Sequence, residues 1–318
     1  MAQLNSPSIT GLLTLGYSAF TGDVGAIWYD TVTNNIKYTY QGIPADVWSN
    51  GGSLSVGRYS LAGAGTQNAG LAFGGCASPS KVSCTEEYNG SSWSSGGGLI
   101  TPRSNLAGAG TQNAGLAIGG YVVGSVSCTE EYNGSSWSSG GSLITGRFDL
   151  AGAGTQNDGL AFGGARSSPF GQVSCTEEYN GSSWSTGGGL SIARYRLSGA
   201  GTQNAGLAFG GASPNLSCTE EYNGATWSTG GALIIGRVVA GGTGTQNAGL
   251  VFGGASSGPG AISCTEEYNG SSWSTGGALS TARYFLAGGG NANAGLAFGG
   301  RTTCTNTEQY NVVCICNL

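Results

Sequence analysis

Adjacent glutamates that recur along the chain are its clearest candidates for carboxylate chemistry. Five pairs occur: Glu86/Glu87, Glu130/Glu131, Glu177/Glu178, Glu220/Glu221 and Glu266/Glu267. Two carboxyl groups that act on one bond must point into the same space, as the acid and base of a glycosidase do. Each pair lies in an alternating Cys-Thr-Glu-Glu-Tyr run that predicts a β-strand, and neighbouring strand residues point to opposite faces. The pairs are therefore not predicted to be catalytic.

An arginine recurs with the same period as the glutamate pairs. The six are Arg58, Arg103, Arg147, Arg194, Arg237 and Arg283. A ring of equivalent residues, one in each repeat, favours a structural role over a catalytic one. We expect one glutamate of each pair to form a buried ion pair with this arginine between neighbouring repeats. These glutamates are Glu86, Glu130, Glu177, Glu220 and Glu266.

Histidine is absent from the chain, which excludes Ser-His-Asp and Cys-His catalysis and imidazole metal ligands. We expect no cofactor and no metal site. Cysteines hold one fixed place in each repeat: Cys84, Cys128, Cys175, Cys218, Cys264 and Cys304. Equivalent positions should lie beyond the roughly 7 Å Cα limit of a disulfide, so these residues are predicted to be small buried hydrophobes. A disulfide from Cys314 or Cys316 to Cys304 stays open.

Composition limits the classes of partner. The net charge is −5, only 8% of residues are charged, and no basic cluster occurs, so no nucleic-acid partner is expected. The longest apolar runs are far too short to span a membrane, and no membrane insertion is expected. The opening segment MAQLNSPSITGLLTLG lacks the cationic start of a secretory signal, which predicts folding in the cytoplasm of the producing cell.

The candidate residues all belong to one internal repeat of about 45 residues. The segment LAGAGTQNAGLAFGG at 61–75 recurs at 106–120, 150–164 and 197–211, with looser copies at 240–254 and 286–300. Four short strands are predicted in each unit: LAGAG, GLAFGG, CTEEY, and a last strand from the Trp through an apolar pair to the Arg. TQNAG and YNGSS form turns, because Asn and Gly tolerate positive φ. Four strands in each of six repeats predict an all-β propeller of six four-stranded blades.

The order of these motifs resembles the kelch repeat. Gly-Gly closes the second strand, Glu-x-Tyr-Asn follows, then a Trp, and an Arg opens the next unit; the resemblance covers residues 48–311. It implies a kelch-like six-bladed β-propeller over residues 46–318. Some kelch-like propellers are copper oxidases, but the histidine ligands which that activity needs are missing here. The last unit lacks its Trp strand and Trp48 supplies one, so an N-terminal outer strand is predicted to close the ring.

Residues 1–45 are predicted to form an arm and a β-hairpin. The stretch GAIWYDTVTNNIKYTYQG (25–42) has two alternating runs around Val-Thr-Asn-Asn. It resembles IWYDT stretches of bacteriophage tail-fibre and virion proteins. The resemblance implies that residues 1–45 attach the protein to a particle.

Two connections in each unit vary while the TQNAG and YNGSSW turns stay almost constant. The variable ones follow the Gly-Gly pair and the Arg, and in a meander blade both lie on the same face, the variable face. Loops on a constant scaffold carry function, and Tyr, Arg and Phe are enriched at recognition sites. The predicted binding residues are Tyr59, Asn105, Tyr121, Phe148, Asp149, Arg166, Phe170, Tyr195, Arg196, Tyr284, Phe285 and Arg301. Drift in unconstrained loops is the alternative.

These observations favour a non-enzymatic virion protein of the phage type, either a tail-fibre adhesin or a surface decoration. Its partners would be other virion proteins through the N-terminal arm and a host-surface glycan or protein through the variable face. It would assemble in the host cytoplasm and be exposed extracellularly on the virion. Two alternatives are a structural subunit that self-assembles as a homo-oligomer and, disfavoured by the missing histidines, a glycan-active enzyme.

Overall fold

The computed structural model describes residues 24–30, 35–40, 46–212, 217–256 and 260–312. The chain is divided into two compact units, Met1–Ala45 and Asp46–Leu318. In the first, β1 (Val24–Asp30) and β2 (Asn35–Tyr40) pair antiparallel. No helix in the described ranges is long and apolar enough to cross a membrane.

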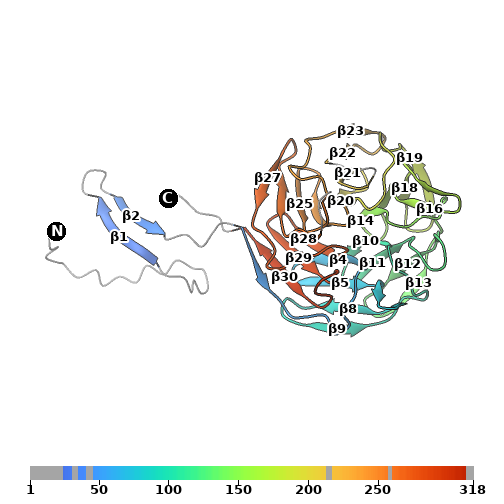
Figure 1. Cartoon of the computed structure of the whole chain (residues 1–318), viewed down its shortest axis with the longest axis horizontal. Helices are drawn as coiled ribbons and strands as arrows, with labels where there is room; N and C mark the ends of the chain where they lie inside the picture. The colour runs from blue at the N-terminus through green and yellow to red at the C-terminus, as the bar shows by residue number, and fades with distance from the viewer. Residues whose placement is uncertain (1–23, 31–34, 41–45, 213–216, 257–259, 313–318) are drawn as a thin grey trace. The chain divides into compact units, whose positions relative to one another are not determined.

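The second unit is a six-bladed β-propeller, and the predicted fold class is confirmed. Six four-stranded antiparallel blades surround a central axis (Figure 1). The inner strands are β4 (Ala62–Thr66), β10 (Ala107–Thr111), β14 (Ala151–Gly154), β20 (Ser198–Thr202), β24 (Gly241–Thr245) and β28 (Ala287–Asn291). The second strands are β5 (Ala69–Phe73), β11 (Ala114–Ile118), β15 (Gly159–Phe162), β21 (Ala205–Phe209), β25 (Ala248–Phe252) and β29 (Ala294–Phe298).

Two further strands complete each blade toward its outer edge. The third strands are β8 (Thr85–Tyr88), β12 (Thr129–Tyr132), β18 (Thr176–Tyr179), β22 (Thr219–Tyr222), β26 (Thr265–Tyr268) and β30 (Thr307–Asn311). The outer strands are β9 (Trp93–Gly96), β13 (Trp137–Ser139), β19 (Trp184–Gly187), β23 (Trp227–Thr229), β27 (Trp273–Gly276) and β3 (Val47–Asn50). They are shorter than predicted, because the apolar pair and the Arg lie on the crossing to the next blade.

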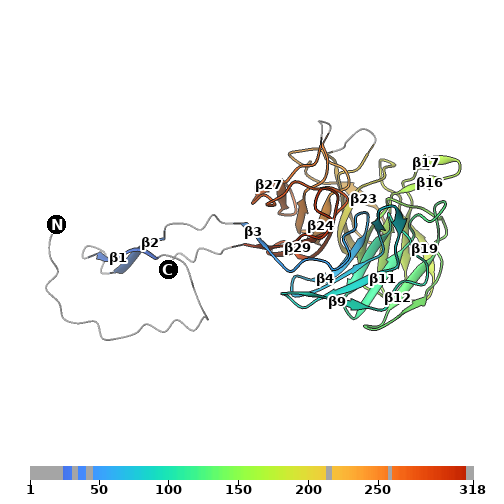
Figure 2. The same cartoon turned by 60° about the horizontal axis from the view of Figure 1, so that its bottom comes forward.

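Small hairpins extend two of the second-to-third connections. One comprises β6 (Cys76–Ala77) and β7 (Ser80–Lys81), and the other β16 (Ala165–Ser167) and β17 (Phe170–Gln172). The second hairpin stands out from the blades on one side of the ring (Figure 2).

The ring closes through β3, which pairs with β30 as the outer strand of the sixth blade. Trp48 lies opposite Tyr310 in this ladder. Three strands of that blade therefore come from the C-terminal repeat and one from before the first repeat, as the sequence predicts.

Small residues allow the inner strands to approach one another around the axis. A Cβ at Gly108 would clash with the carbonyl oxygen of Gly63 on the neighbouring inner strand, and one at Gly63 would clash with Gly288. The repeated Ala-Gly-Ala-Gly pattern is thus required by six strands that share one axis.

Large apolar side chains fill the spaces between blades in a repeated arrangement. In the first such cluster, Leu71 and Phe73 pack against Tyr132 and Trp137 of the next blade. The indole N–H of Trp137 also donates to the hydroxyl of Thr85, 2.9 Å away. The same bond recurs in every blade, with donors Trp48, Trp93, Trp137, Trp184, Trp227 and Trp273.

The cysteine prediction is wrong in one respect: all six repeated cysteines are half-buried rather than buried. They precede the third strand, where Arg147 donates to the backbone carbonyl of Cys175 and Arg194 donates to the thiol of Cys218. Cys304 is a free thiol in this structure, while Cys314 and Cys316 lie outside the described residues.

A glutamine in the TQNAG turn links five of the six blades to the preceding blade. Gln112, for example, donates from Nε2 to the carbonyl oxygens of Gly70 (3.0 Å) and Tyr88 (2.7 Å). Equivalent bonds form in five blades, through Gln67, Gln112, Gln156, Gln203 and Gln246. The sixth blade has Ala292 at this position.

Ala292→Gln is therefore expected to stabilise the propeller. The new amide would reach the equivalent carbonyls of Gly249 and Tyr268, and a net gain of about 1 kcal/mol is typical of such a hydrogen bond. Guanidinium unfolding measures the change, with Gln156→Ala as a matched variant that should lose a similar amount. A lower midpoint for Ala292→Gln would contradict this account.

Candidate functional site

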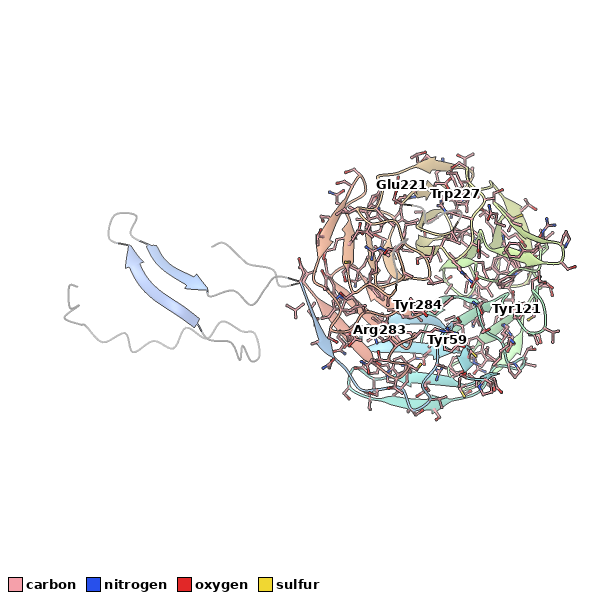
Figure 3. The ribbon with its side chains drawn as sticks, viewed as in Figure 1. Tyr59, Tyr121, Glu221, Trp227, Arg283 and Tyr284 are labelled. Atoms are coloured by element: carbon pink, nitrogen blue, oxygen red, sulfur yellow. The ribbon has the colours of Figure 1, made fainter. Side chains whose placement is uncertain are left out.

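The two variable connections of each blade meet on the variable face. An antiparallel bridge joins them in every blade: Tyr59 to Cys76, Ser104 to Tyr121, Phe148 to Ala165, Tyr195 to Ala212, Val238 to Ala255 and Tyr284 to Arg301. All twelve residues predicted to bind lie on these connections. Tyr59 and Tyr284 lie toward the centre of the ring, whereas Glu221 and Trp227 lie near its outer edge (Figure 3).

A closed ring of six backbone hydrogen bonds encircles the axis at this face. Its members, the axial ring, are Ser60, Asn105, Asp149, Arg196, Val239 and Phe285. The amide of each member donates to the carbonyl oxygen of the equivalent residue one blade earlier, over 2.7–3.0 Å. The amide of Ser60 donates to Phe285, which closes the ring between the sixth blade and the first.

Every member of the axial ring has a left-handed backbone, with φ between 49° and 58°. A residue with a Cβ pays roughly 1–2 kcal/mol in this region, whereas glycine adopts it freely. At other recurring left-handed positions, such as Gly74 and Gly75, the chain uses glycine. The axial ring instead holds six different side chains. Strain retained in this way is a feature of functional sites.

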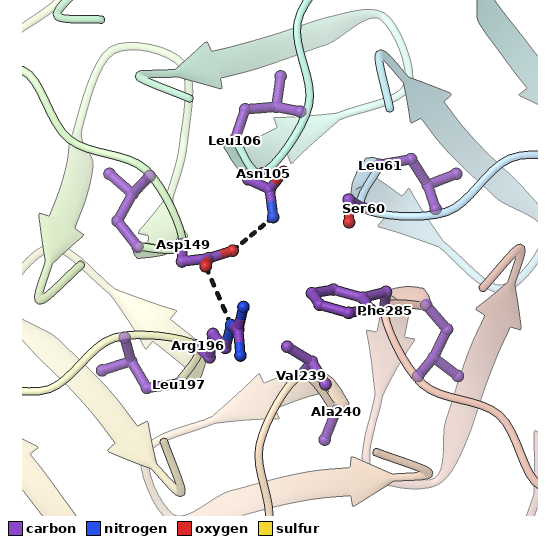
Figure 4. A pocket seen from close by; sticks show the side chains of 12 residues that line it. Ser60, Leu61, Asn105, Leu106, Asp149, Arg196, Leu197, Val239, Ala240 and Phe285 are labelled. Atoms are coloured by element: carbon purple, nitrogen blue, oxygen red, sulfur yellow. Dashed lines mark hydrogen bonds and ion pairs between the residues drawn. The ribbon is translucent and has the colours of Figure 1, made fainter. Parts of the chain in front are cut away.

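The axial ring surrounds the opening of the central axis on the variable face, which we call the mouth. The mouth has one polar side and one apolar side (Figure 4). Asp149 accepts hydrogen bonds from Asn105 Nδ2 (2.6 Å) and from Arg196 Nε (3.1 Å). Val239 and Phe285 form the apolar side. Together the ring lines a cavity of about 80 Å³ above a layer of leucines.

The Arg196 guanidinium lies near the axis itself. Asp149 and Phe285 occupy opposite positions of the axial ring, and Arg196 contacts both, with its Cζ 5.6 Å from the centre of the Phe285 ring. The Asp149 side chain is 5% exposed and that of Arg196 is 40% exposed. Burial raises the pKa of Asp149, although the hydrogen bond from Asn105 and the charge of Arg196 act in the opposite direction.

Aromatic rings and cations form several close pairs on the variable face. Arg301 lies over Tyr59, with its Cζ 4.3 Å from the ring centre, and donates to its hydroxyl. The Nζ atom of Lys81 lies 5.1 Å from the centre of the Tyr121 ring. Edge-to-face ring pairs join Tyr121 to Phe148 and Phe170 to Tyr195. Arg166 is exposed on the β16–β17 hairpin.

Sequence reasoning selected four of the six axial residues and missed Ser60 and Val239. Both stand two residues after the recurring Arg, which is the position of the four selected residues in their own repeats, so alignment of the repeats would have identified them. It also missed Lys81, although Lys81 lies in the variable segment CASPSKV. None of these three residues is of a type that is enriched at interfaces.

No family model matches this chain, and no curated protein matches it either. Within the described ranges, no three His, Cys, Asp or Glu side chains come together as a metal site. Below the mouth, the axis continues through cavities of about 140 and 170 Å³ lined mainly by glycine and alanine of the inner strands. Among the residues that line these three cavities, the charged and aromatic ones lie at the mouth.

The recurring arginines form buried ion pairs away from the mouth. The pairs are Arg58–Glu86, Arg103–Glu130, Arg147–Glu177, Arg194–Glu220, Arg237–Glu266 and Arg283–Glu308. Each arginine lies on the crossing from one blade and meets a glutamate in the third strand of the next. Glu308 was not selected from the sequence, because its strand reads Thr-Glu-Gln-Tyr and lacks the paired acids.

The second glutamate of each pair faces the next blade, so the two acids do point apart. Tyr132 donates to Glu87 at 2.6 Å, and the same bond links Tyr179, Tyr222, Tyr268 and Tyr310 to the preceding blade. At the sixth junction, Gln309 donates to the hydroxyl of Tyr88 instead. Burial, with the glutamate acceptor, raises the pKa of Tyr132, Tyr179, Tyr222 and Tyr268 to about 12.

These tyrosines predict an alkaline unfolding transition. Their pKa in the unfolded chain is about 10, so their contribution to stability is complete below about pH 10 and is lost as the pH rises through about 12. Tyrosinate absorbance and β-sheet ellipticity should therefore change together between these values. Ionisation of all the tyrosines near pH 10 with unchanged ellipticity would contradict the inter-blade role of these hydroxyls.

Proposed function

We propose that the propeller is a non-enzymatic binding module of a phage-type virion, a tail-fibre adhesin or a surface decoration, and that its variable face attaches to a host surface. The axial ring carries this proposal. Six positions with one backbone conformation hold six different side chains, in a chain whose scaffold residues repeat almost unchanged. A constant scaffold with diversified surface positions is the arrangement expected of a recognition protein.

The kelch-like order of motifs and the N-terminal segment support the rest of the proposal. Residues 25–42 resemble stretches of phage tail-fibre proteins, and β1 pairs with β2 within this segment. Residues 1–45 would bind other virion proteins. The particle would assemble in the host cytoplasm and expose the propeller outside the cell.

Binding to cells tests the proposal. Fluorescently labelled protein is mixed with a panel of bacterial isolates, and an antibody against the propeller is used to search for it in phage particles. We expect binding to particular isolates and staining of particles. The matched control carries asparagine at all six axial positions, since asparagine tolerates the left-handed backbone. This control should fold but lose binding to the cells.

Other outcomes favour other functions. Absence of both cell binding and particle staining would remove the proposal. Self-association of the purified protein without ligand, lost on deletion of residues 1–45, would favour a lattice or fibre subunit. Release of reducing ends from a polysaccharide would favour a glycan-active enzyme.

A further inference from the structure

The charges of the propeller are separated between its faces. Lys37 is the only lysine or arginine outside the propeller, and six of the other ten are held in the buried ion pairs. The remaining four are Lys81, Arg166, Arg196 and Arg301. All four lie on the variable face. The propeller segments outside the description contain no lysine, arginine, aspartate or glutamate.

Carboxylates are almost absent from the same face. Asp149 is there, and it is nearly buried and already bonded to Asn105 and Arg196. The second glutamates are held between blades by tyrosines, and Asp158 lies in the turn between β14 and β15 on the opposite face. Four cations and one carboxylate give the variable face a charge of about +3, although the whole chain carries −5. Such a face attracts anions.

Arg196 has the geometry of an anchor for one anionic group. Its Nε binds Asp149, and within the described residues no hydrogen bond occupies its Nη1 and Nη2. Stacking beside Tyr195 and Phe285 holds the guanidinium near the axis. A planar guanidinium with two parallel donors suits a carboxylate, which accepts both.

The aromatic rings of the variable face identify the rest of the ligand. Tyr59, Tyr121 and Tyr195 are half-buried, so part of each ring is open to solvent, and each has a cation beside it. The C–H faces of a pyranose pack on such rings, and its hydroxyls can bond to neighbouring polar groups such as Ser60 and Asn105. We infer that the variable face binds an acidic saccharide. Arg196 holds a sugar carboxylate at the axis, and sugar rings stack on Tyr59, Tyr121 and Tyr195. This inference rests on the proposed binding function.

Two other anionic ligands fit the face less well. A nucleic acid brings one phosphate for each nucleotide, and its affinity grows with the number of phosphates that the protein neutralises; four cations spread over this face would neutralise few of them. A sulfated polysaccharide presents dense charge, whereas this face offers one central guanidinium with cations spread around the rim. Both serve as competitors in the test.

The test compares charge variants whose new residues tolerate the local backbone conformation. Asp149→Asn removes the carboxylate that competes for Arg196; the new amide can still accept from Arg196 and donate to a flipped Asn105. Arg196→Asn removes the anchor and keeps a residue that tolerates positive φ. Asp158→Asn makes the same charge change on the opposite face, and Lys37→Gln removes a cation outside the propeller. The probes are oligosaccharides of galacturonate, alginate and hyaluronate, each beside its carboxyl-reduced form, measured by titration calorimetry at low salt.

We expect at least one carboxylated probe to bind and its reduced form to bind at least about tenfold more weakly. Asp149→Asn should tighten binding about fivefold, Arg196→Asn should weaken it at least about tenfold, and both controls should stay within about twofold. The inference is overturned if no carboxylated probe binds, if the reduced form binds equally, or if Arg196→Asn has no effect. Tighter binding of dextran sulfate or of an oligothymidylate would also overturn it. If cell binding persists in any of these cases, the ligand class is wrong while the proposed function stands.

Discussion

Replacing Arg147 with alanine is expected to lower the free energy of unfolding by about 3–5 kcal/mol, the range for breaking one partner of a buried ion pair. Arg147 is fully buried, and its Nη2 lies 3.2 Å from Glu177 Oε1. It also donates to the carbonyl oxygens of Cys175 (2.7 Å) and Ala161 (3.2 Å). Alanine would leave the Glu177 carboxylate buried without a cation and would remove one donor from each of these carbonyls.

Guanidinium unfolding of three variants checks this expectation. Arg166→Ala removes an exposed arginine of the variable face and should change stability by less than about 0.5 kcal/mol. The double variant Arg147→Met with Glu177→Leu should recover much of the loss, because packed apolar side chains can replace a buried ion pair. An unchanged midpoint for Arg147→Ala would mean that the recurring arginines do not hold the blades together.

The fold could be predicted because its physical causes are local and repeated. Glycine spacing in the inner strand, the Gly-Gly pair, the Glu-Glu-Tyr run and the Trp each recur at fixed intervals. The missing Trp of the last repeat and the extra Trp48 before the first also predict ring closure. These features can be recognised in the linear sequence because each blade contacts only its neighbours.

The axial ring could be predicted only in part. Its left-handed backbone cannot be read from Ser60, Arg196 or Phe285, because these residue types do not favour positive φ. That conformation is imposed by the closed ring of hydrogen bonds, which exists only when all six blades are in place. Sequence differences between the repeats identified Asn105 and Asp149 as candidates. That these side chains meet at the mouth follows only from closure of the ring.

The charge of the variable face was missed for a related reason. A net charge of −5 and the absence of a basic cluster argued against a nucleic-acid partner and indicated no cationic surface. Six buried arginine–glutamate pairs neutralise twelve charges among themselves. The cations of the variable face then have almost no carboxylates near them. Net charge therefore described the whole chain correctly and this surface wrongly.

Trp48→Ala is expected to destabilise the propeller as much as Trp184→Ala, by about 3–5 kcal/mol each. Trp48 stands 217 residues from Thr265, to whose hydroxyl it donates at 2.9 Å. Its ring centre lies 4.9 Å from those of Phe252 and Tyr310. Trp184 makes the equivalent bond to Thr129 at 3.0 Å inside the continuous run of repeats.

The comparison separates a closed ring from an open one. In a closed ring, β3 is an interior element, and loss of its Trp weakens the junction between the fifth and sixth blades as much as Trp184→Ala weakens its own junction. In an open ring, β3 would fray from its edge, and Trp48→Ala would cost less than about 1 kcal/mol. Equal shifts in the guanidinium midpoints would support closure, and a small shift for Trp48→Ala alone would contradict it. The axial ring depends on this result, because its last hydrogen bond, from Ser60 to Phe285, forms only if the sixth blade meets the first.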